Sequence, residues 1–463
     1  MVDIMTLNGD QSALPAPQIS ALRSGLRGPV LLAGDEGYEA ARRVWNGNVD
    51  RHPAVIVRCM NASDVEQAVD FARTRSLLVS IRGGGHSAPG YGTNDGGLVI
   101  DLSAMKAISV DPARRTARAE GGVLWRDFDA ATQAHGLATT GGTVSNTGIG
   151  GLTLGGGLGW LGGKHGLSID NLLSAEVVTA DGQLRKASAE EHPDLFWALR
   201  GGGGNFGVVT AFEYRLHPVS EVLGGMVLYP LDQAAAVLRF YRDFCPTLPD
   251  EAEAYAALLT SPEGVPVAAL LLGYNGPVDQ GEKILAPARR FGTPLADLVA
   301  PMPYVARQSM LDVPFAEHGL HRYWRSAFTE HPPDALIDEL VAAAAKFSSP
   351  LSSLILFYLH GAGARVPATE TAFSARRVQW DFDAIGQWAE GTQSPAHIAW
   401  VRETWKRVEP HLKGSVYINH VAADDLPEKV RASFGDNYQR LRQLKTRFDP
   451  TNLFRMNANI PPG

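Results

Sequence analysis

The glycines of this chain are concentrated in three clusters, at residues 83–85, 148–159 and 201–207. Glycine loses more backbone freedom on folding than any other residue, so such density is unfavourable unless the backbone requires it. Glycine is required where the backbone approaches a ligand closely or adopts a positive φ, and successive N–H groups in such loops form concave nests for phosphate oxygens. Tight turns would explain one cluster. Three clusters in one half of the chain indicate an extended anionic cofactor.

Composition excludes several classes of protein. Lys+Arg 42 against Asp+Glu 49 gives a net charge of −7, which argues against a nucleic-acid binder. No apolar run approaches the roughly 18 residues of a membrane span, and the N-terminus lacks the basic start and apolar core of a secretory signal. Cys59 and Cys245 are too few for a disulfide framework or a Cys-rich metal site. We therefore expect a cytoplasmic protein with no nucleic-acid or membrane partner.

The length of 463 residues exceeds the roughly 250–300 at which a single core stops growing, so we expect several structural units. We predict an irregular N-terminal segment at 1–35, because Pro15 and Pro17 should break any early element. A glycine-dense cofactor unit follows at 36–218, and a substrate unit at 219–410. The substrate unit alternates strand and helix patterns, which predicts an α+β fold with helices on one face of a sheet. A C-terminal segment occupies 411–463.

The glycine clusters do not match the common nucleotide motifs well. Gly157–Gly162 and Gly202–Gly207 both fit G-x-G-x-x-G, but neither lies between a strand and a helix as a Rossmann site requires. Gly163-Lys164 is followed by His165, so the phosphate-binding P-loop is absent as well.

His86 is the most informative histidine, because it follows a strand pattern and three glycines. Its imidazole would face whatever the glycine backbone approaches, although a capping or core histidine is the alternative reading. The other histidines form no H-E-x-x-H pair, so we expect no metal site.

Longer stretches carry a resemblance to a known family. Arg82-Gly83-Gly84-Gly85-His86-Ser87, GYGTNDGGLVIDLS and VSNTGIGGLTLGGGLGWLGGKHGLSIDNL resemble the PCMH-type FAD-binding domain. Tyr417-Ile418-Asn419 and FGDNYQRLRQLKTRFDPTNLFRMNANIPP extend the resemblance to the berberine-bridge-enzyme-like oxidases of the vanillyl-alcohol-oxidase superfamily. The match covers 35–463. It is most similar to bacterial members such as the 6-hydroxy-D-nicotine oxidases and secondary-metabolite tailoring oxidases.

The resemblance implies FAD attached covalently through His86 to its 8α-methyl group. Many family members hold a second link through a cysteine, whose place is taken here by Val144, so we expect a single link. The remaining residues implied to contact the cofactor are Arg82, Gly83, Gly84, Gly85, Ser87, Thr143, Ser145, Gly148, Gly150, Gly151, Asn205, Gly207, Val209, Asn457 and Asn459.

The resemblance also implies three catalytic positions. Tyr417 is the candidate base, with Asn419 nearby, and Thr147 flanks the reactive face of the flavin and influences access of O2. The segment SVYINHV, which holds Tyr417, is predicted to be a strand, and a packing tyrosine in that strand is the alternative. A phenol needs its ordinary pKa of about 10 lowered to act as a base. The strand position where the family often has a carboxylate holds Ile355, which puts a carboxylate-assisted mechanism in doubt.

These observations predict an oxidase that transfers a hydride from an alcohol or amine carbon of a small or medium-sized organic substrate to FAD, with O2 as the acceptor that yields hydrogen peroxide. A flavin dehydrogenase with another acceptor is the nearest alternative. A flavoprotein that sequesters a drug-like ligand is a second. An NAD enzyme or a flavin-free binding module is a further alternative. It would require the N-terminal and C-terminal motifs of the family to occur together by coincidence. We expect a monomer or a homodimer.

Overall fold

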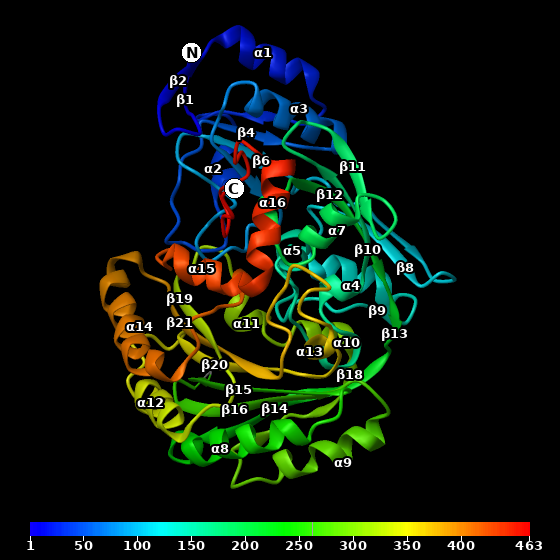
Figure 1. Ribbon diagram of the computed structural model, residues 1–463. Coiled ribbons are helices and arrows are strands. Elements are labelled where there is room, and N and C mark those ends of the chain that lie inside the picture. Colours follow the sequence, from blue (N-terminus) through cyan, green and yellow to red (C-terminus); the bar gives the residue numbers. More distant parts are fainter. Residues whose placement is uncertain (262) are drawn as a thin grey trace.

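The computed structural model describes residues 1–261 and 263–463, and it has an α+β architecture in which the largest sheet lies apart from two smaller ones (Figure 1). The first smaller sheet has the order β3-β4-β6-β5. Strands β4 (Val55–Arg58), β6 (Leu98–Asp101) and β5 (Val79–Arg82) run parallel, and β3 (Val30–Leu31) pairs antiparallel with β4. The central strands are apolar runs buried on both faces, as parallel sheets require.

The second smaller sheet is antiparallel with the order β11-β10-β12-β8-β7. Its strands are β7 (Ile108–Asp111), β8 (Thr116–Glu120), β10 (Leu172–Val178), β11 (Leu184–Ser188) and β12 (Val208–Arg215). Strands β10 and β11 form a hairpin, with Gly182 in its turn at φ 80°. Helix α3 (Ala62–Arg73) contacts β6 of the first sheet and both β10 and β12 of the second. It therefore packs between the two smaller sheets.

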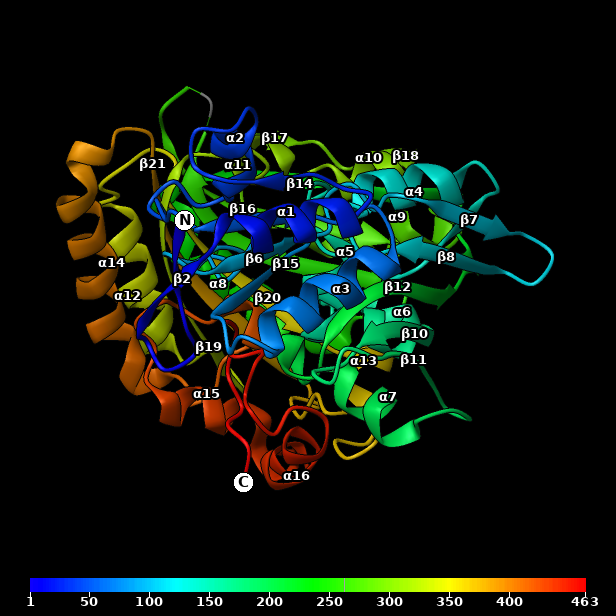
Figure 2. The same ribbon diagram turned by 90° about the horizontal axis from the view of Figure 1, so that it is seen from above.

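The largest sheet has eight strands in the order β17-β14-β16-β15-β20-β21-β19, with β18 beside β14. Its strands are β14 (Glu221–Pro230), β15 (Ala252–Thr260), β16 (Pro266–Tyr274), β17 (Ala296–Asp297), β18 (Ala300–Pro303), β19 (His321–Thr329), β20 (Ser353–Leu359) and β21 (Gln379–Trp388). The longer helices α8 (Ala234–Phe244), α9 (Val278–Arg289), α12 (Asp334–Ala344) and α14 (Ser394–Val408) cover one face (Figures 1 and 2). The other face is turned toward the smaller sheets.

The N-terminal segment is structured, so the prediction of an irregular 1–35 is wrong. Strands β1 (Val2–Met5) and β2 (Gln11–Leu14) pair antiparallel, and α1 (Ala16–Gly25) and α2 (Tyr38–Arg42) follow. Pro15 precedes α1 and Pro17 lies in its first turn. The first turn of a helix tolerates proline because its N–H groups have no intrahelical partner. The two prolines therefore mark the start of a helix.

The C-terminal segment returns to the smaller sheets through α15 (Pro427–Phe434), α16 (Tyr438–Phe448) and an extended tail (Figure 1). Lys445 is fully buried, and its ammonium donates to Asp449 Oδ2 at 2.7 Å, to the Asn205 carbonyl at 2.8 Å and to the Phe454 carbonyl at 2.9 Å. Phe454 is itself buried in the core beneath the first sheet. This buried network fixes the tail against the unit that carries the glycine clusters.

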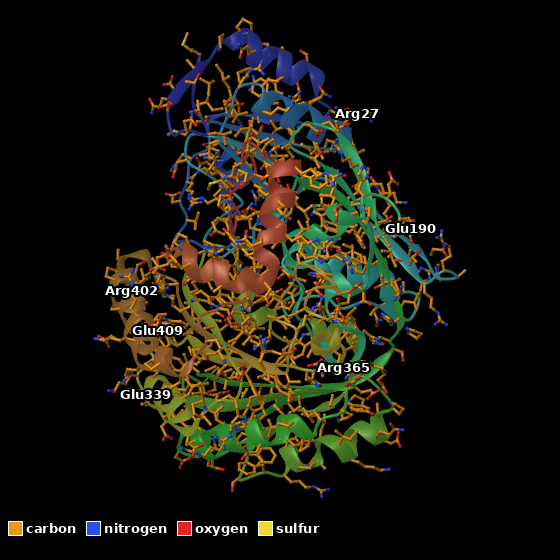
Figure 3. The ribbon with its side chains drawn as sticks, in the orientation of Figure 1. Arg27, Glu190, Glu339, Arg365, Arg402 and Glu409 are labelled. Carbon is orange, nitrogen blue, oxygen red and sulfur yellow. The ribbon has the colours of Figure 1, made fainter. Side chains whose placement is uncertain are left out.

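Shorter elements complete the fold. They are β9 (Leu137–Ala138) and β13 (His217–Pro218), the helices α4 (Trp125–Gln133), α5 (Ile149–Leu154), α6 (Gly162–His165), α7 (Pro193–Leu199), α10 (Tyr304–Gln308), α11 (Asp312–Phe315) and α13 (Gly361–Arg365), and the 3-10 turns η1 (Ser168–Asp170), η2 (Gly203–Asn205), η3 (Leu231–Gln233), η4 (Cys245–Thr247), η5 (Gly391–Gln393), η6 (Glu409–His411), η7 (Ile418–His420) and η8 (Gly435–Asn437). Charged side chains such as Arg27, Glu190 and Arg402 lie at the outer margins of the molecule (Figure 3). Within the described residues, none of the helices has the length and apolar character needed to cross a membrane.

Candidate active site

One cavity collects backbone from all three glycine clusters. Its walls include Gly83–Gly85 after β5, Gly148 to Gly151 at the start of α5, and Gly203 to Gly207 around η2. The tail contributes Met456, Asn457 and Ala458. The largest sheet closes the other side with residues from β15, β20 and β21. Segments that are far apart in the sequence thus meet around a single chamber.

The cavity walls fit a flavin nucleotide. Glycine is needed in them, because a Cβ on Gly84 would lie 2.5 Å from the Gly148 nitrogen and Gly85 has a φ of 69°. A Cβ on Gly151 would meet no heavy atom within 4 Å, so free space lies beside that backbone. Asn457 Oδ1 is buried without a hydrogen-bond partner among the described residues. The chamber therefore offers glycine backbone to phosphates and an unused acceptor to a ligand N–H or O–H.

The structure places most of the predicted cofactor and catalytic residues on this cavity. The residues that line it are Gly83, Gly84, Gly85, His86, Ser87, Thr143, Thr147, Gly148, Gly150, Gly151, Gly207, Val209, Tyr417, Asn419 and Asn457. Val144, in the place of the family's second attachment site, lines it too. Both cysteines lie elsewhere, buried in apolar cores, and burial raises the pKa of both thiols.

Four predicted cofactor residues do not line the cavity. The Arg82 guanidinium donates to the Ala41 carbonyl, and Ser145 Oγ donates to Asp312 Oδ2 at 2.6 Å. Asn205 is fully buried and bridges to the tail, with its Nδ2 donating to the Ala458 carbonyl at 3.1 Å and its Oδ1 accepting from the Ile460 N–H. Asn459 is outside the lining as well. A cofactor-binding motif contains residues that contact the cofactor and residues that only shape the loop around it. Sequence alone does not distinguish these two kinds of residue.

His86 is packed against aromatic rings at the edge of the cavity. Its ring stacks on Trp45 with centroids 4.2 Å apart, and it meets the ring of His318 in a T-shaped arrangement with centroids 6.4 Å apart. Its Nε2 is 3.1 Å from Asn146 Oδ1. Burial, His318 and Arg322 lower the pKa of His86 to about 3. The imidazole is therefore neutral at physiological pH and keeps a lone pair.

Tyr417 does not lie in a strand, so the prediction of a strand over SVYINHV is wrong. Tyr417 precedes the turn η7, in which the His420 N–H donates to the Tyr417 carbonyl at 2.7 Å. The segment has no strand partner among the described residues, and the turn lets Tyr417 and His420 approach each other, with ring centroids 4.8 Å apart. The Tyr417 hydroxyl accepts from the N–H of Gly157 at 2.9 Å and from Asn419 Nδ2 at 2.7 Å. Burial raises the pKa of Tyr417 to about 12, so it remains a phenol at neutral pH.

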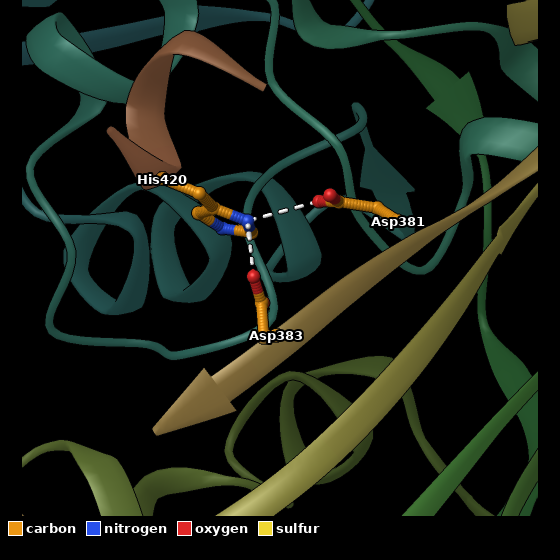
Figure 4. Close-up of side chains that lie close together, drawn as sticks. All are labelled: Asp381, Asp383 and His420. Atoms are coloured by element: carbon orange, nitrogen blue, oxygen red, sulfur yellow. Dashed lines mark ion pairs between the residues drawn. The ribbon is translucent and has the colours of Figure 1, made fainter. Parts of the chain in front are cut away.

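A buried acidic pair beside His420 was missed by the sequence analysis (Figure 4). Asp381 and Asp383 are fully buried on β21, and His420 Nδ1 lies 2.9 Å from Asp381 Oδ2 and 3.2 Å from Asp383 Oδ1. In the sheet register Asp383 lies opposite Ile355 on β20. Two carboxylates are thus present on the strand next to β20, opposite and near Ile355. Alternate aspartates within the otherwise apolar WDFDAIG were the available signal.

The charges in this acidic cluster (Asp381, Asp383 and His420) are set by burial and by each other. Burial and the charge of Asp383 raise the pKa of Asp381 to about 6. Burial alone would lower the pKa of His420, but Asp383 and Asp381 raise it to about 10. One nitrogen or oxygen atom from each of the three side chains lies within 4.8 Å of the other two, a spacing at which such groups could surround a cation. Protonated His420 supplies that positive charge itself.

The two carboxylate oxygens of Asp381 have different surroundings. Its Oδ1 accepts from Ser326 Oγ at 3.0 Å. Its Oδ2 forms the ion pair with His420 but has no aligned hydrogen bond among the described residues. Asp383 instead accepts from Trp324 Nε1 at 2.9 Å. Asp381 lines the cavity and can therefore receive a proton from a bound molecule.

The part of the chamber around the acidic cluster is apolar. The side chains that line it are Tyr255, Leu311, Phe315, Trp324, Ile355, Phe357 and Ile385. Most of them belong to one hydrophobic cluster on the cavity face of the largest sheet. Flat, weakly polar molecules are complementary to such walls.

Known proteins are similar to this chain in sequence. Residues 53–188 match the family described as FAD binding domain, and residues 416–461 match the family described as berberine and berberine like. (R)-6-hydroxynicotine oxidase of Paenarthrobacter nicotinovorans is 31% identical over 94% of this chain and 97% of its own length. An FAD-linked oxidoreductase of Dictyostelium discoideum is 33% identical over 94% and 95%.

Two solved structures have a fold similar to that of this chain. The crystal structure of 6-hydroxy-D-nicotine oxidase from Arthrobacter nicotinovorans has a TM-score of 0.85 at 30% identity, over 95% of this chain and 98% of that chain. Glucooligosaccharide oxidase of Acremonium strictum, at 24% identity, shares the fold with a TM-score of 0.86 over 96% and 98%.

A glycine-walled nucleotide cavity joined to an apolar chamber under a large antiparallel sheet defines an FAD-binding oxidoreductase. This chain belongs to the berberine-bridge-enzyme-like family of FAD-linked oxidoreductases. The predicted family and fold class are thereby confirmed.

Proposed function

We propose that the protein is an oxidase that takes a hydride from an alcohol or amine carbon of a small or medium-sized, largely apolar molecule and uses O2 as the electron acceptor. The observation that carries this proposal is the buried carboxylate of Asp381, which lines an aromatic-walled chamber and whose Oδ2 has an ion-pair partner but no aligned hydrogen bond among the described residues. We propose further that FAD is attached through His86 alone, since Val144 takes the second attachment position and neither cysteine lines the cavity.

Bound FAD supplies the redox chemistry, by accepting a hydride and passing the electrons to O2, which leaves as hydrogen peroxide. The protein must then hold the substrate and remove its O–H or N–H proton. Asp381 suits that task, because a base with a pKa of about 6 is mostly ionised at neutral pH and still binds a proton well. Protonated His420 and the Ser326 hydroxyl hold the carboxylate in place.

A panel of benzylic and heteroaromatic alcohols and amines tests this function in air. A compound that is consumed with an equal amount of hydrogen peroxide supports the oxidase. Reduction of a dye by the same compound, without peroxide in air, would show a dehydrogenase. Tight binding with no turnover of any bound compound would indicate a protein that sequesters its ligand. Either of the last two results overturns the proposal.

The pH dependence of kcat/KM should reflect the acidic cluster. Asp381 must be ionised to accept a proton, so the rate should fall as pH drops below about 6, the pKa of this group. A second fall in kcat/KM is expected above about pH 10, where His420 loses the proton that holds Asp381. Initial rates across this range, with a substrate whose own ionisation lies outside it, provide the measurement. A flat profile between pH 5 and pH 8 would contradict the assignment of Asp381.

Tyr417→Phe distinguishes a supporting tyrosine from a catalytic base. The substitution leaves the buried N–H groups of Gly157 and Leu158 without their acceptor, which should lower the free energy of unfolding by about 1–3 kcal/mol. Because the phenol is not the base, kcat should fall by less than about tenfold, against the 100-fold or more expected for a base. Thermal denaturation and steady-state kinetics measure the two effects. A kcat loss above 100-fold with unchanged stability would reassign Tyr417 as the base.

A further inference from the structure

The imidazole of His86 has a side-chain partner for its Nε2 atom, the amide of Asn146, and the ring also lies near the backbone of His86 itself. Asn146 lies in the loop between Val144 and Thr147, both of which line the cavity. Its Nδ2 donates to the carbonyl of Ala316, just after α11 in the substrate unit. The contact therefore joins the attachment histidine to a loop that is fixed from the opposite unit.

The Ala316 contact determines which way the Asn146 amide faces. A backbone carbonyl only accepts hydrogen bonds, so the NH2 group must point at Ala316 and Oδ1 must point at His86. Oδ1 also only accepts, so the proton in the 3.1 Å contact belongs to His86 Nε2. A neutral imidazole carries one N–H, and the other nitrogen has the lone pair. The nucleophilic nitrogen of His86 is therefore Nδ1.

The surroundings of His86 keep the ring in this neutral form and in one plane. Burial and the nearby His318 and Arg322 lower the pKa of His86 to about 3. The stacked indole of Trp45 restricts rotation of the ring, and Trp45 is itself held by its Nε1 donating to the Phe315 carbonyl at 2.7 Å. A fixed ring with a fixed tautomer presents one nitrogen for bond formation.

We propose that Asn146 is a positioning residue for covalent FAD attachment, which holds the His86 proton on Nε2 and so directs bond formation to Nδ1. This inference rests on the proposed His86 link. It assigns a function to a side chain that the family resemblance left without one.

O2 is the oxidant in the formation of the bond between His86 and the 8α-methyl group. The 8α-methyl carbon loses one hydrogen as a proton, the Nδ1 lone pair forms the N–C bond, and the flavin ring system is left reduced by two electrons. O2 then takes that electron pair with two protons, one originating from the methyl group and one from solvent, and leaves as hydrogen peroxide. His86 retains its Nε2 proton, which becomes more acidic on the cationic product and still donates to Asn146 Oδ1.

Variants at residue 146 test the positioning role. Asn146→Leu removes the acceptor at similar volume, whereas Asn146→Asp keeps an acceptor oxygen. Each protein, prepared under riboflavin limitation and mixed with FAD, is followed by the fraction of flavin that stays with the denatured chain. We expect attachment about tenfold or more slower in the leucine variant and near the parental rate in the aspartate variant. Glu317→Gln, a change to an exposed side chain beside Ala316, should match the parent. Attachment at the parental rate in the leucine variant would overturn the proposal.

The linked nitrogen can be identified in the unmodified protein, so the test does not depend on a variant that folds. Nuclear magnetic resonance of the isolated flavinyl peptide distinguishes Nδ1 from Nε2 substitution of the imidazole. A bond to Nδ1 is expected, and a bond to Nε2 would overturn the inference while leaving the covalent link intact. FAD released on denaturation of the parent would overturn both the inference and the link. The oxidase proposal would still be judged separately, by peroxide release.

Discussion

Asp381→Asn is expected to lower kcat by about 100- to 10,000-fold, the usual contribution of a general base. Asparagine keeps the size of the side chain and the acceptor for the Ser326 hydroxyl, but its amide cannot take the substrate proton. The glycine walls and His86 are unchanged, so FAD content and the flavin absorbance spectrum should match the parent. Steady-state turnover per bound flavin gives the measurement.

Asp424→Asn is the matched control for this experiment. Asp424 lies in the same region but pairs with Arg325 and accepts from the Tyr323 hydroxyl, and it does not line the cavity. Its substitution should change kcat by less than threefold. An Asp381→Asn enzyme that retains more than a tenth of parental turnover would contradict the role of Asp381 as the proton acceptor.

His86→Ala is expected to abolish covalent attachment of FAD, because the substitution removes the histidine that follows the glycines after β5 and is the proposed nucleophile. Val144 takes the position of the alternative cysteine, and Cys59 and Cys245 are buried in apolar cores away from the chamber. On acid precipitation the yellow colour should stay with the parental pellet and move to the supernatant in the variant. Intact mass should show one FAD per parental chain.

His318→Asn is a matched control for the His86 substitution. His318 is a neighbouring histidine whose edge faces His86, so its loss changes the same local environment without removing the nucleophile. The control should keep its flavin on the pellet. Colour retained on the pellet of His86→Ala would show that another side chain carries the link.

The glycine-rich loops of the cofactor cavity could be predicted from sequence because they depend on local backbone conformation. Runs such as Gly83-Gly84-Gly85-His86 mark close approach of the chain to a ligand whatever the surrounding fold. Asn205 shows the limit, since it lies within a glycine cluster yet bonds to the C-terminal tail more than 250 residues away along the chain. Only tertiary structure reveals that partner.

The proposed catalytic residues were harder to predict because they are brought together across the sheet. Asp381 and Asp383 come from β21, His420 comes from a turn near the C-terminus, and Ile355 lies opposite Asp383 in register. The i, i+2 spacing joins only the two aspartates, and no spacing in the sequence joins them to His420 or to Ile355. The turn at Tyr417 was not predicted for a related reason, because the segment SVYINHV has the residue types of a strand but belongs to no sheet within the described part of the chain.

Reoxidation of the reduced protein by O2 distinguishes an oxidase from a dehydrogenase, and the measurement needs no substrate. The purified protein is reduced with dithionite without air until its yellow absorbance is lost, and is then mixed with aerated buffer. We expect the absorbance to return within seconds, with one hydrogen peroxide formed per flavin. A protein that stays bleached in air for minutes but regains its colour with a dye would be a dehydrogenase, and the proposed oxidase function would be wrong.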